Sequence, residues 1–99
     1  MLMIKEIQIE NHKYRLVKEY KDGFNQEDVS LKYTDYFDDF DYIFGDYSYD
    51  KLRLKGFYSK ENSKCCEINN IEKIDDYIRD YCAFECRHFL LEKIDSEKN

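Results

Sequence analysis

A chain of 99 residues with a formal net charge of −6 and 17% aromatic residues is long enough for one domain with a single core. The acidic balance argues against a general nucleic-acid-binding protein, because affinity for phosphates needs a basic surface. No hydrophobic run approaches the roughly 20 residues that span a membrane, and the first residues turn polar too soon for a signal peptide. We therefore expect a cytoplasmic protein, without membrane contact, in which the four cysteines stay reduced.

The N-terminal part of the chain predicts a β-hairpin. Residues 3–10 and residues 13–20 each alternate between apolar and polar side chains, as strands with one buried face do. Asn11 and His12 between them suit a tight turn, because asparagine tolerates a positive φ.

A helix is expected to follow. Asn25 is a favourable N-cap, and the acidic residues after it lie at the positive end of the helix dipole. Phe24 and Val29 have the spacing of a hydrophobic staple. Apolar side chains then recur at helical spacing as far as Phe40, so the pattern predicts a helix that ends around Asp39.

Two further strands are predicted after this helix. Residues 42–44 form a short apolar run, which Gly45 and Asp46 close. In residues 51–58, Leu52 and Leu54 point to one face. The opposite face carries Lys51, Arg53, Lys55 and Phe57. This strand is therefore expected to be half-buried, with a basic face turned to solvent.

The C-terminal part predicts a second helix, which opens at residues 68–70, and then a central strand. Residues 88–91 are partly apolar on both sides of an alternating pattern, which is typical of a strand covered on both faces. The elements together predict a single α+β domain over residues 1–94 with the order ββαββαβ. We expect a mostly antiparallel sheet with two helices packed on one face, and a charged tail over residues 95–99.

Three segments carry a resemblance to a known family. They are Gly45-Asp46-Tyr47, the run Leu52-Arg53-Leu54-Lys55-Gly56-Phe57-Tyr58, and the stretch from Asp75-Asp76-Tyr77 to Tyr81-Cys82-x-Phe84-x-Cys86. Together they resemble the YutD-like family of small proteins from low-GC Gram-positive bacteria, over residues 13–93. The resemblance implies an intracellular α+β domain, and it carries over neither an activity nor catalytic residues.

Cys82 and Cys86 are candidate zinc ligands, because they lie one turn apart if the second helix continues that far. The remaining ligands would come from Cys65, Cys66, His88 or His12. The spacing argues against this site, since adjacent cysteines rarely both reach one metal ion. We favour a protein without a cofactor, in which Cys82 and Cys86 are small buried hydrophobic residues, and keep a zinc-stabilised domain as an alternative.

Acidic side chains crowd the middle of the chain and raise the question of an enzyme. They are Asp35, Asp38, Asp39, Asp41, Asp46 and Asp50. Their spacing matches no calcium-binding loop, and no nucleophile is evidently placed beside them. A small enzyme that uses Asp46 is therefore the least favoured hypothesis.

The basic face of residues 51–58 predicts the functional surface. Our leading hypothesis is a non-catalytic binding module that contacts an unidentified protein partner. Its contact surface is expected at Gly45, Asp46, Tyr47, Arg53, Lys55 and Phe57. The alternative is RNA binding through the same strand, because cations beside exposed rings on a sheet suit single-stranded RNA. The pattern does not indicate an oligomeric state.

Overall fold

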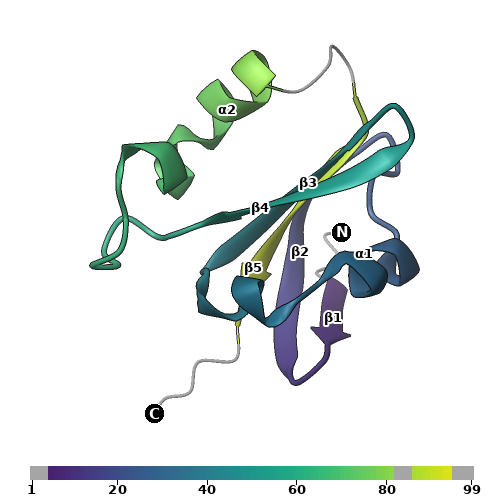
Figure 1. Ribbon diagram of the computed structural model, residues 1–99, viewed down its shortest axis with the longest axis horizontal. Coiled ribbons are helices and arrows are strands. Elements are labelled where there is room, and N and C mark those ends of the chain that lie inside the picture. The colour runs from purple at the N-terminus through teal and green to yellow at the C-terminus, as the bar shows by residue number, and fades with distance from the viewer. Residues whose placement is uncertain (1–4, 82–85, 95–99) are drawn as a thin grey trace.

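The computed structural model describes residues 5–81 and 86–94, and a five-stranded antiparallel sheet forms its centre. The strand order is β1-β2-β5-β3-β4, so β5 lies in the middle and β4 at one edge (Figure 1). The strands are β1 (Lys5–Ile9), β2 (His12–Tyr20), β3 (Tyr42–Ser48), β4 (Lys51–Phe57) and β5 (His88–Lys93). The helices are α1 (Gln26–Lys32) and α2 (Ile74–Tyr81), with short 3-10 helices η1 (Asp35–Asp39), η2 (Glu67–Asn69) and η3 (Ile71–Lys73). The predicted α+β class and element order are confirmed.

Two tight hairpins connect neighbouring strands. The first turn lies at Glu10 and Asn11, one residue earlier than predicted, because Ile9 pairs with His12. In the second, Tyr49 and Asp50 have φ values of 54° and 64°, which match the type I′ turn that suits the twist of a hairpin. The strand β3 therefore runs on to Ser48, and the prediction that Gly45 and Asp46 close it is wrong.

The two helices cover opposite faces of the sheet (Figure 1). On β3, Ile43 belongs to the cluster that contains Val29 of α1, whereas its neighbour Phe44 belongs to the cluster packed by Ile74 of α2. On β5, Phe89 and Leu91 likewise belong to the cluster with Val29, whereas Leu90 between them belongs to the cluster packed by Ile74. The prediction that both helices pack on one face is wrong, because consecutive apolar residues in a strand point to both faces and both faces need cover.

The predicted N-cap of α1 is confirmed, since the side chain of Asn25 accepts a hydrogen bond of 2.9 Å from the Asp28 amide. The helix ends at Lys32 rather than near Asp39. Tyr33 turns inward there and its hydroxyl lies 2.9 Å from that of Tyr14 on β2. None of the helices in the described ranges is long and apolar enough to cross a membrane.

Candidate partner-binding site

The six residues predicted to form the contact surface lie on β3 and β4 but do not share one exposed face. Asp46 and Arg53 are cross-strand neighbours on the α2 face of the sheet. Tyr47 points to the α1 face, where its hydroxyl donates a hydrogen bond of 2.7 Å to Asp28. The expectation that Phe57 is exposed is wrong, since only 1% of it is accessible and the Tyr77 ring of α2 packs edge-on against it. Whether these residues bind a partner stays a prediction.

Arg53 forms an ion pair with Asp46 inside the protein, so its charge is already balanced without another molecule. Its Nη2 and Nε atoms lie 2.6 Å and 3.0 Å from the two carboxylate oxygens of Asp46. Asp46 is only 2% exposed, so this two-point contact balances a buried charge. The same Nη2 donates to the backbone carbonyl of Tyr81, the last residue of α2, at 3.2 Å. Arg53 thus ties the end of α2 to the sheet.

Lys55 lies on the same face of β4 as Arg53, but its charge is next to aromatic rings and not next to a carboxylate. Its ammonium nitrogen is 4.9 Å from the centre of the Phe57 ring and 5.8 Å from that of Tyr77, which are cation–π distances. Burial lowers the pKa of Lys55 from its ordinary value. Within the described ranges no carboxylate forms an ion pair with Lys51 or Lys55.

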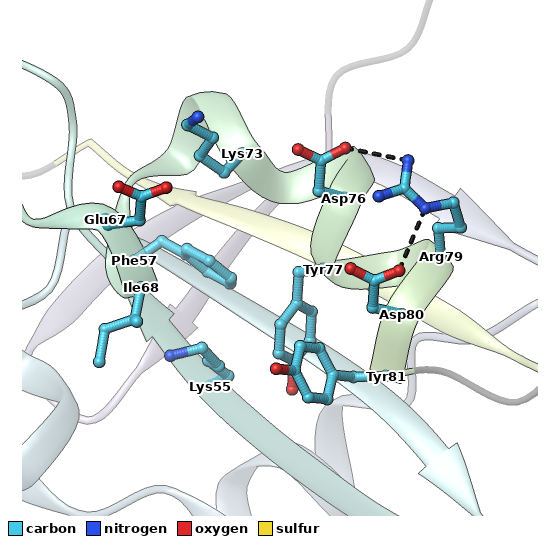
Figure 2. A pocket seen from close by; sticks show the side chains of 10 residues that line it. All are labelled: Lys55, Phe57, Glu67, Ile68, Lys73, Asp76, Tyr77, Arg79, Asp80 and Tyr81. Carbon is cyan, nitrogen blue, oxygen red and sulfur yellow. Dashed lines mark hydrogen bonds and ion pairs between the residues drawn. The ribbon is translucent and has the colours of Figure 1, made fainter.

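A hollow of about 530 Å³ opens between α2, η2 and β4, and we call it the outer groove. It is lined by Lys55, Phe57, Glu67, Ile68, Lys73, Asp76, Tyr77, Arg79, Asp80 and Tyr81 (Figure 2). Lys55 lies between Ile68 and Tyr77 in this view. Ile68 is 75% exposed and Tyr81 is 66% exposed, so two large apolar side chains at the groove face solvent.

A second hollow of about 400 Å³ continues along β4, and we call it the edge hollow. It shares Lys55, Ile68 and Tyr77 with the outer groove. Its other lining residues are Tyr36, Phe37, Phe40, Arg53, Leu54, Gly56 and Asn69. The two hollows therefore lie next to each other beside the edge strand.

Sequence reasoning missed Ile68 and Tyr81 as surface residues. Helical spacing in the sequence places Tyr81 on one apolar face with Ile74 and Ile78, and in the structure Tyr81 lies one turn after Tyr77. The two rings do stack, with centroids 5.0 Å apart, but only Tyr77 also contacts the rings of the sheet. The available signal for the exposure of Tyr81 was its position, one helical turn beyond Tyr77, whose ring contacts the sheet.

Comparison with known proteins decides the family. The model of the family described as "Putative antitoxin YutD-like" matches residues 8–92. The chain belongs to this family. A protein of Bacillus subtilis (strain 168) named "Putative antitoxin YutD" is 43% identical over 88 residues, which are 89% of this chain and 97% of that protein. The solution NMR structure of protein yutD from B. subtilis is similar, with a TM-score of 0.77 and 40% identity over 96% of this chain and 86% of that one.

The acidic residues of this YutD-like domain have structural contacts. Asp39 accepts hydrogen bonds from Lys64 and Tyr58, and these bonds lower the pKa of its carboxyl group. Asp41 accepts from the Ser59 amide at 2.8 Å and thereby holds the start of the loop that follows β4. These contacts give Asp39 and Asp41 a structural role at the segment that follows β4.

The zinc hypothesis remains a prediction. Cys82, one of its two main ligands, lies outside the described residues, and Cys65, Cys66 and Cys86 have free thiols. Among residues 5–81 and 86–94, no cluster of three or more histidine, cysteine or acidic side chains could hold a metal ion.

The burial of His88 predicts that the stability of the fold depends on pH. It pairs with Asp46 across β5 and β3, and its ring stacks on Tyr20 with centroids 5.1 Å apart. Burial lowers the pKa of His88 from the ordinary 6.5, against the opposing effect of its hydrogen bond with the Cys86 carbonyl. A histidine with a lowered folded-state pKa stabilises the fold fully above pH 6.5, and this contribution declines as the pH falls below that value.

We therefore expect the free energy of unfolding to decrease between pH 7 and pH 5, by at most about 1.4 kcal/mol per pH unit from this group. Urea unfolding across that range measures the slope. His88→Asn should flatten it, because asparagine does not titrate in this range. Equal slopes in the wild type and His88→Asn would contradict the assignment to His88.

Proposed function

We propose that this YutD-like domain is a cytoplasmic antitoxin, a non-catalytic binding module that holds a protein partner in the outer groove. The name of the B. subtilis relative supports the antitoxin class, and an antitoxin that acts by binding needs an exposed surface for its partner. The observation that carries the proposal is the exposure of Ile68 and Tyr81 at a hollow of about 530 Å³. Exposed apolar side chains gathered at a hollow mark interaction sites, and tyrosine is enriched among residues that dominate binding energy.

The polar surroundings of the groove fit a protein partner better than RNA. The lining has both signs of charge in equal number, with the cations Lys55, Lys73 and Arg79 and the carboxylates Glu67, Asp76 and Asp80. Mixed charge around an apolar centre is typical of protein interfaces. RNA would need an excess of cations, and the strand predicted for RNA binding has Phe57 buried and Arg53 paired with Asp46.

A growth assay with a matched control tests the function. Depletion of the protein in its host should slow growth, because a toxin would then act unopposed, and re-expression of the wild type should restore growth. The double variant Ile68→Asp/Tyr81→Asp should fail to restore it. The matched control Leu31→Asp/Tyr49→Asp makes the same chemical changes at exposed residues outside the groove and should succeed. Full restoration by a folded groove variant would overturn the proposal.

Photocrosslinking identifies the partner directly. A photoreactive phenylalanine analogue at position 81 should capture one protein in living cells, and the same analogue at position 49 should not. The groove variant should bind that purified protein at least about tenfold more weakly than the wild type does. Capture of RNA instead of protein would replace this proposal with the RNA alternative.

A further inference from the structure

The outer edge of β4 presents backbone groups that point away from the sheet. The Phe57 carbonyl accepts from the Asp41 amide and so faces the β3 side. Tyr58 faces the other way, since its amide donates to Asn69 and its carbonyl accepts from Ile71. Successive residues of a strand alternate in this respect. Because the register between β3 and β4 is continuous, the outward residues of β4 are Leu52, Leu54 and Gly56.

Unlike those of Tyr58, these outward groups pair with no strand among residues 5–81 and 86–94. The chain itself occupies the edge at Tyr58, where Asn70 forms a parallel bridge. Over residues 52–56, the described parts of the chain supply no hydrogen bond to the outward amides and carbonyls. Leu54 and Gly56 instead line the edge hollow. An unpaired strand edge is a template for an added strand.

The edge hollow has walls on both faces of the sheet. Phe40 lies on the α1 face, because a Cβ built on Gly56 would point into its ring. Ile68 and Tyr77 lie on the α2 face, where Tyr77 packs against Phe57. A strand added to β4 would therefore place its alternate side chains against η1 on one side and at the outer groove on the other.

Charge argues against a second copy of this chain as the added strand. Antiparallel pairing of two β4 edges about Leu54 would set Arg53 opposite Lys55 of the other copy. Pairing centred on Arg53 or on Lys55 would also place like charges opposite each other. Cross-strand pairs of like charge are destabilising, and cations on an edge strand are a common protection against self-association.

We propose that the partner adds an extended strand to β4 and that this strand carries two acidic residues four positions apart. The partner's acidic residues lie opposite Lys51 and Lys55. Within the described ranges, neither lysine forms an ion pair with a carboxylate of this chain. The position between them lies opposite Arg53, whose charge Asp46 already balances, so it takes a small uncharged residue. The two intervening side chains are apolar and face Leu52 and Leu54. This inference rests on the proposed function for the identity of the partner, but the strand addition can be measured without it.

The probe is the blocked synthetic peptide Thr-Glu-Val-Ser-Val-Glu-Thr. On NMR titration of the full chain, the peptide should slow exchange of the Leu54 and Gly56 amide protons about tenfold, because these amides gain hydrogen bonds. The amides of Arg53 and Lys55, which face β3, should change little. A peptide with lysine in place of glutamate, and one with N-methylated valines, should not bind. Equal binding of the lysine peptide, or protection elsewhere than at β4, would overturn the proposal.

Two pairs of variants provide matched controls. Leu54→Pro removes an outward amide, whereas Leu54→Ala removes only part of the apolar contact and keeps the amide, so the proline variant should bind the peptide at least about tenfold more weakly than the alanine variant. Lys51→Glu/Lys55→Glu should lose affinity to the same extent, and Lys13→Glu/Lys60→Glu should not. If Leu54→Pro fails to fold, amide exchange in the wild type decides.

The outcomes separate this inference from the proposed function. A crosslinked partner that requires Ile68 and Tyr81 but binds Leu54→Pro as tightly as Leu54→Ala refutes strand addition and leaves the antitoxin proposal standing. Protection of Leu54 and Gly56 by the glutamate peptide, in a protein whose depletion does not affect growth, supports strand addition and refutes the antitoxin proposal.

Discussion

Replacing Gly45 with alanine is expected to destabilise the fold by about 3 kcal/mol. A Cβ atom on Gly45 would lie 2.2 Å from Cζ and 2.5 Å from Cε2 of Phe89, its cross-strand partner on β5. Phe89 is fully buried and packs edge-on against Phe24, with ring centroids 5.2 Å apart. The ring therefore has no room to move away. Gly45 does not have a positive φ, so space and not backbone conformation requires a glycine here.

Urea unfolding of two variants separates this explanation from a general weakness of the strand. Phe89→Leu on its own should cost about 1 kcal/mol, because a smaller side chain leaves a void. The double variant Gly45→Ala/Phe89→Leu should be more stable than Gly45→Ala, since leucine leaves room for the new methyl group. A double variant whose loss equals the sum of the two single losses would show that the contact with the ring is not the cause.

Gly45 also shows where the sequence was ambiguous. Glycine in a strand pattern indicates a turn, a bulge or a close approach, and only the position of Phe89 on a distant strand distinguishes these. The sequence predicted that β3 ends at Gly45, whereas Tyr49 and Asp50 form the turn with positive φ values instead. Neither residue is the glycine that such a turn usually prefers.

The order of elements could be predicted because local signals specify it. The alternation in β1 and β2, the Asn25 cap and the two-sided pattern of β5 all correspond to observed elements. The faces that the helices cover could not be predicted. That choice depends on which strand pairs with which, and β5 enters the sheet between β2 and β3 although it comes last in the chain.

The candidate site was predicted only in part, because its geometry also depends on how the strands pair. The segment around Asp46 and β4 was identified, and Lys55 does line both hollows. The alternation of β4 was predicted correctly, but its basic face is the one that α2 covers, which buries Phe57. The pairing of Asp46 with Arg53 depends on the register set by the Tyr49–Asp50 turn. The residue pattern of β4 alone does not indicate how β4 is aligned with β3.

Replacing Arg53 with methionine is the second change with a large expected effect, about 3 kcal/mol of unfolding free energy. Methionine keeps much of the apolar stem but removes the guanidinium that contacts both carboxylate oxygens of Asp46. Asp46 is nearly inaccessible to water, so its charge would stay buried after losing its cation. Asp46→Asn should cost less, about 1 kcal/mol, because the remaining Arg53 side chain is 47% exposed and can be hydrated.

The double variant Asp46→Asn/Arg53→Met should be less destabilised than the sum of the single changes, since no buried charge then remains. Amide exchange in the last turn of α2 provides an independent measurement. Arg53→Met removes the hydrogen bond to the Tyr81 carbonyl, so exchange there should accelerate more than in the α1 helix, which has no contact with Arg53 among its described hydrogen bonds. Asp46→Asn keeps the guanidinium and should affect α2 less.

An Arg53→Met variant as stable as the wild type would show that the Asp46 charge is balanced by other groups. A loss of stability without faster exchange in α2 would show that the carboxylate contact matters and the helix contact does not. Both results bear on binding, because Tyr81 stands at the end of α2 and at the outer groove. If Arg53 holds that end in place, its role in partner binding is to position Tyr81, and Arg53→Met should weaken binding while Lys55 and Ile68 remain intact.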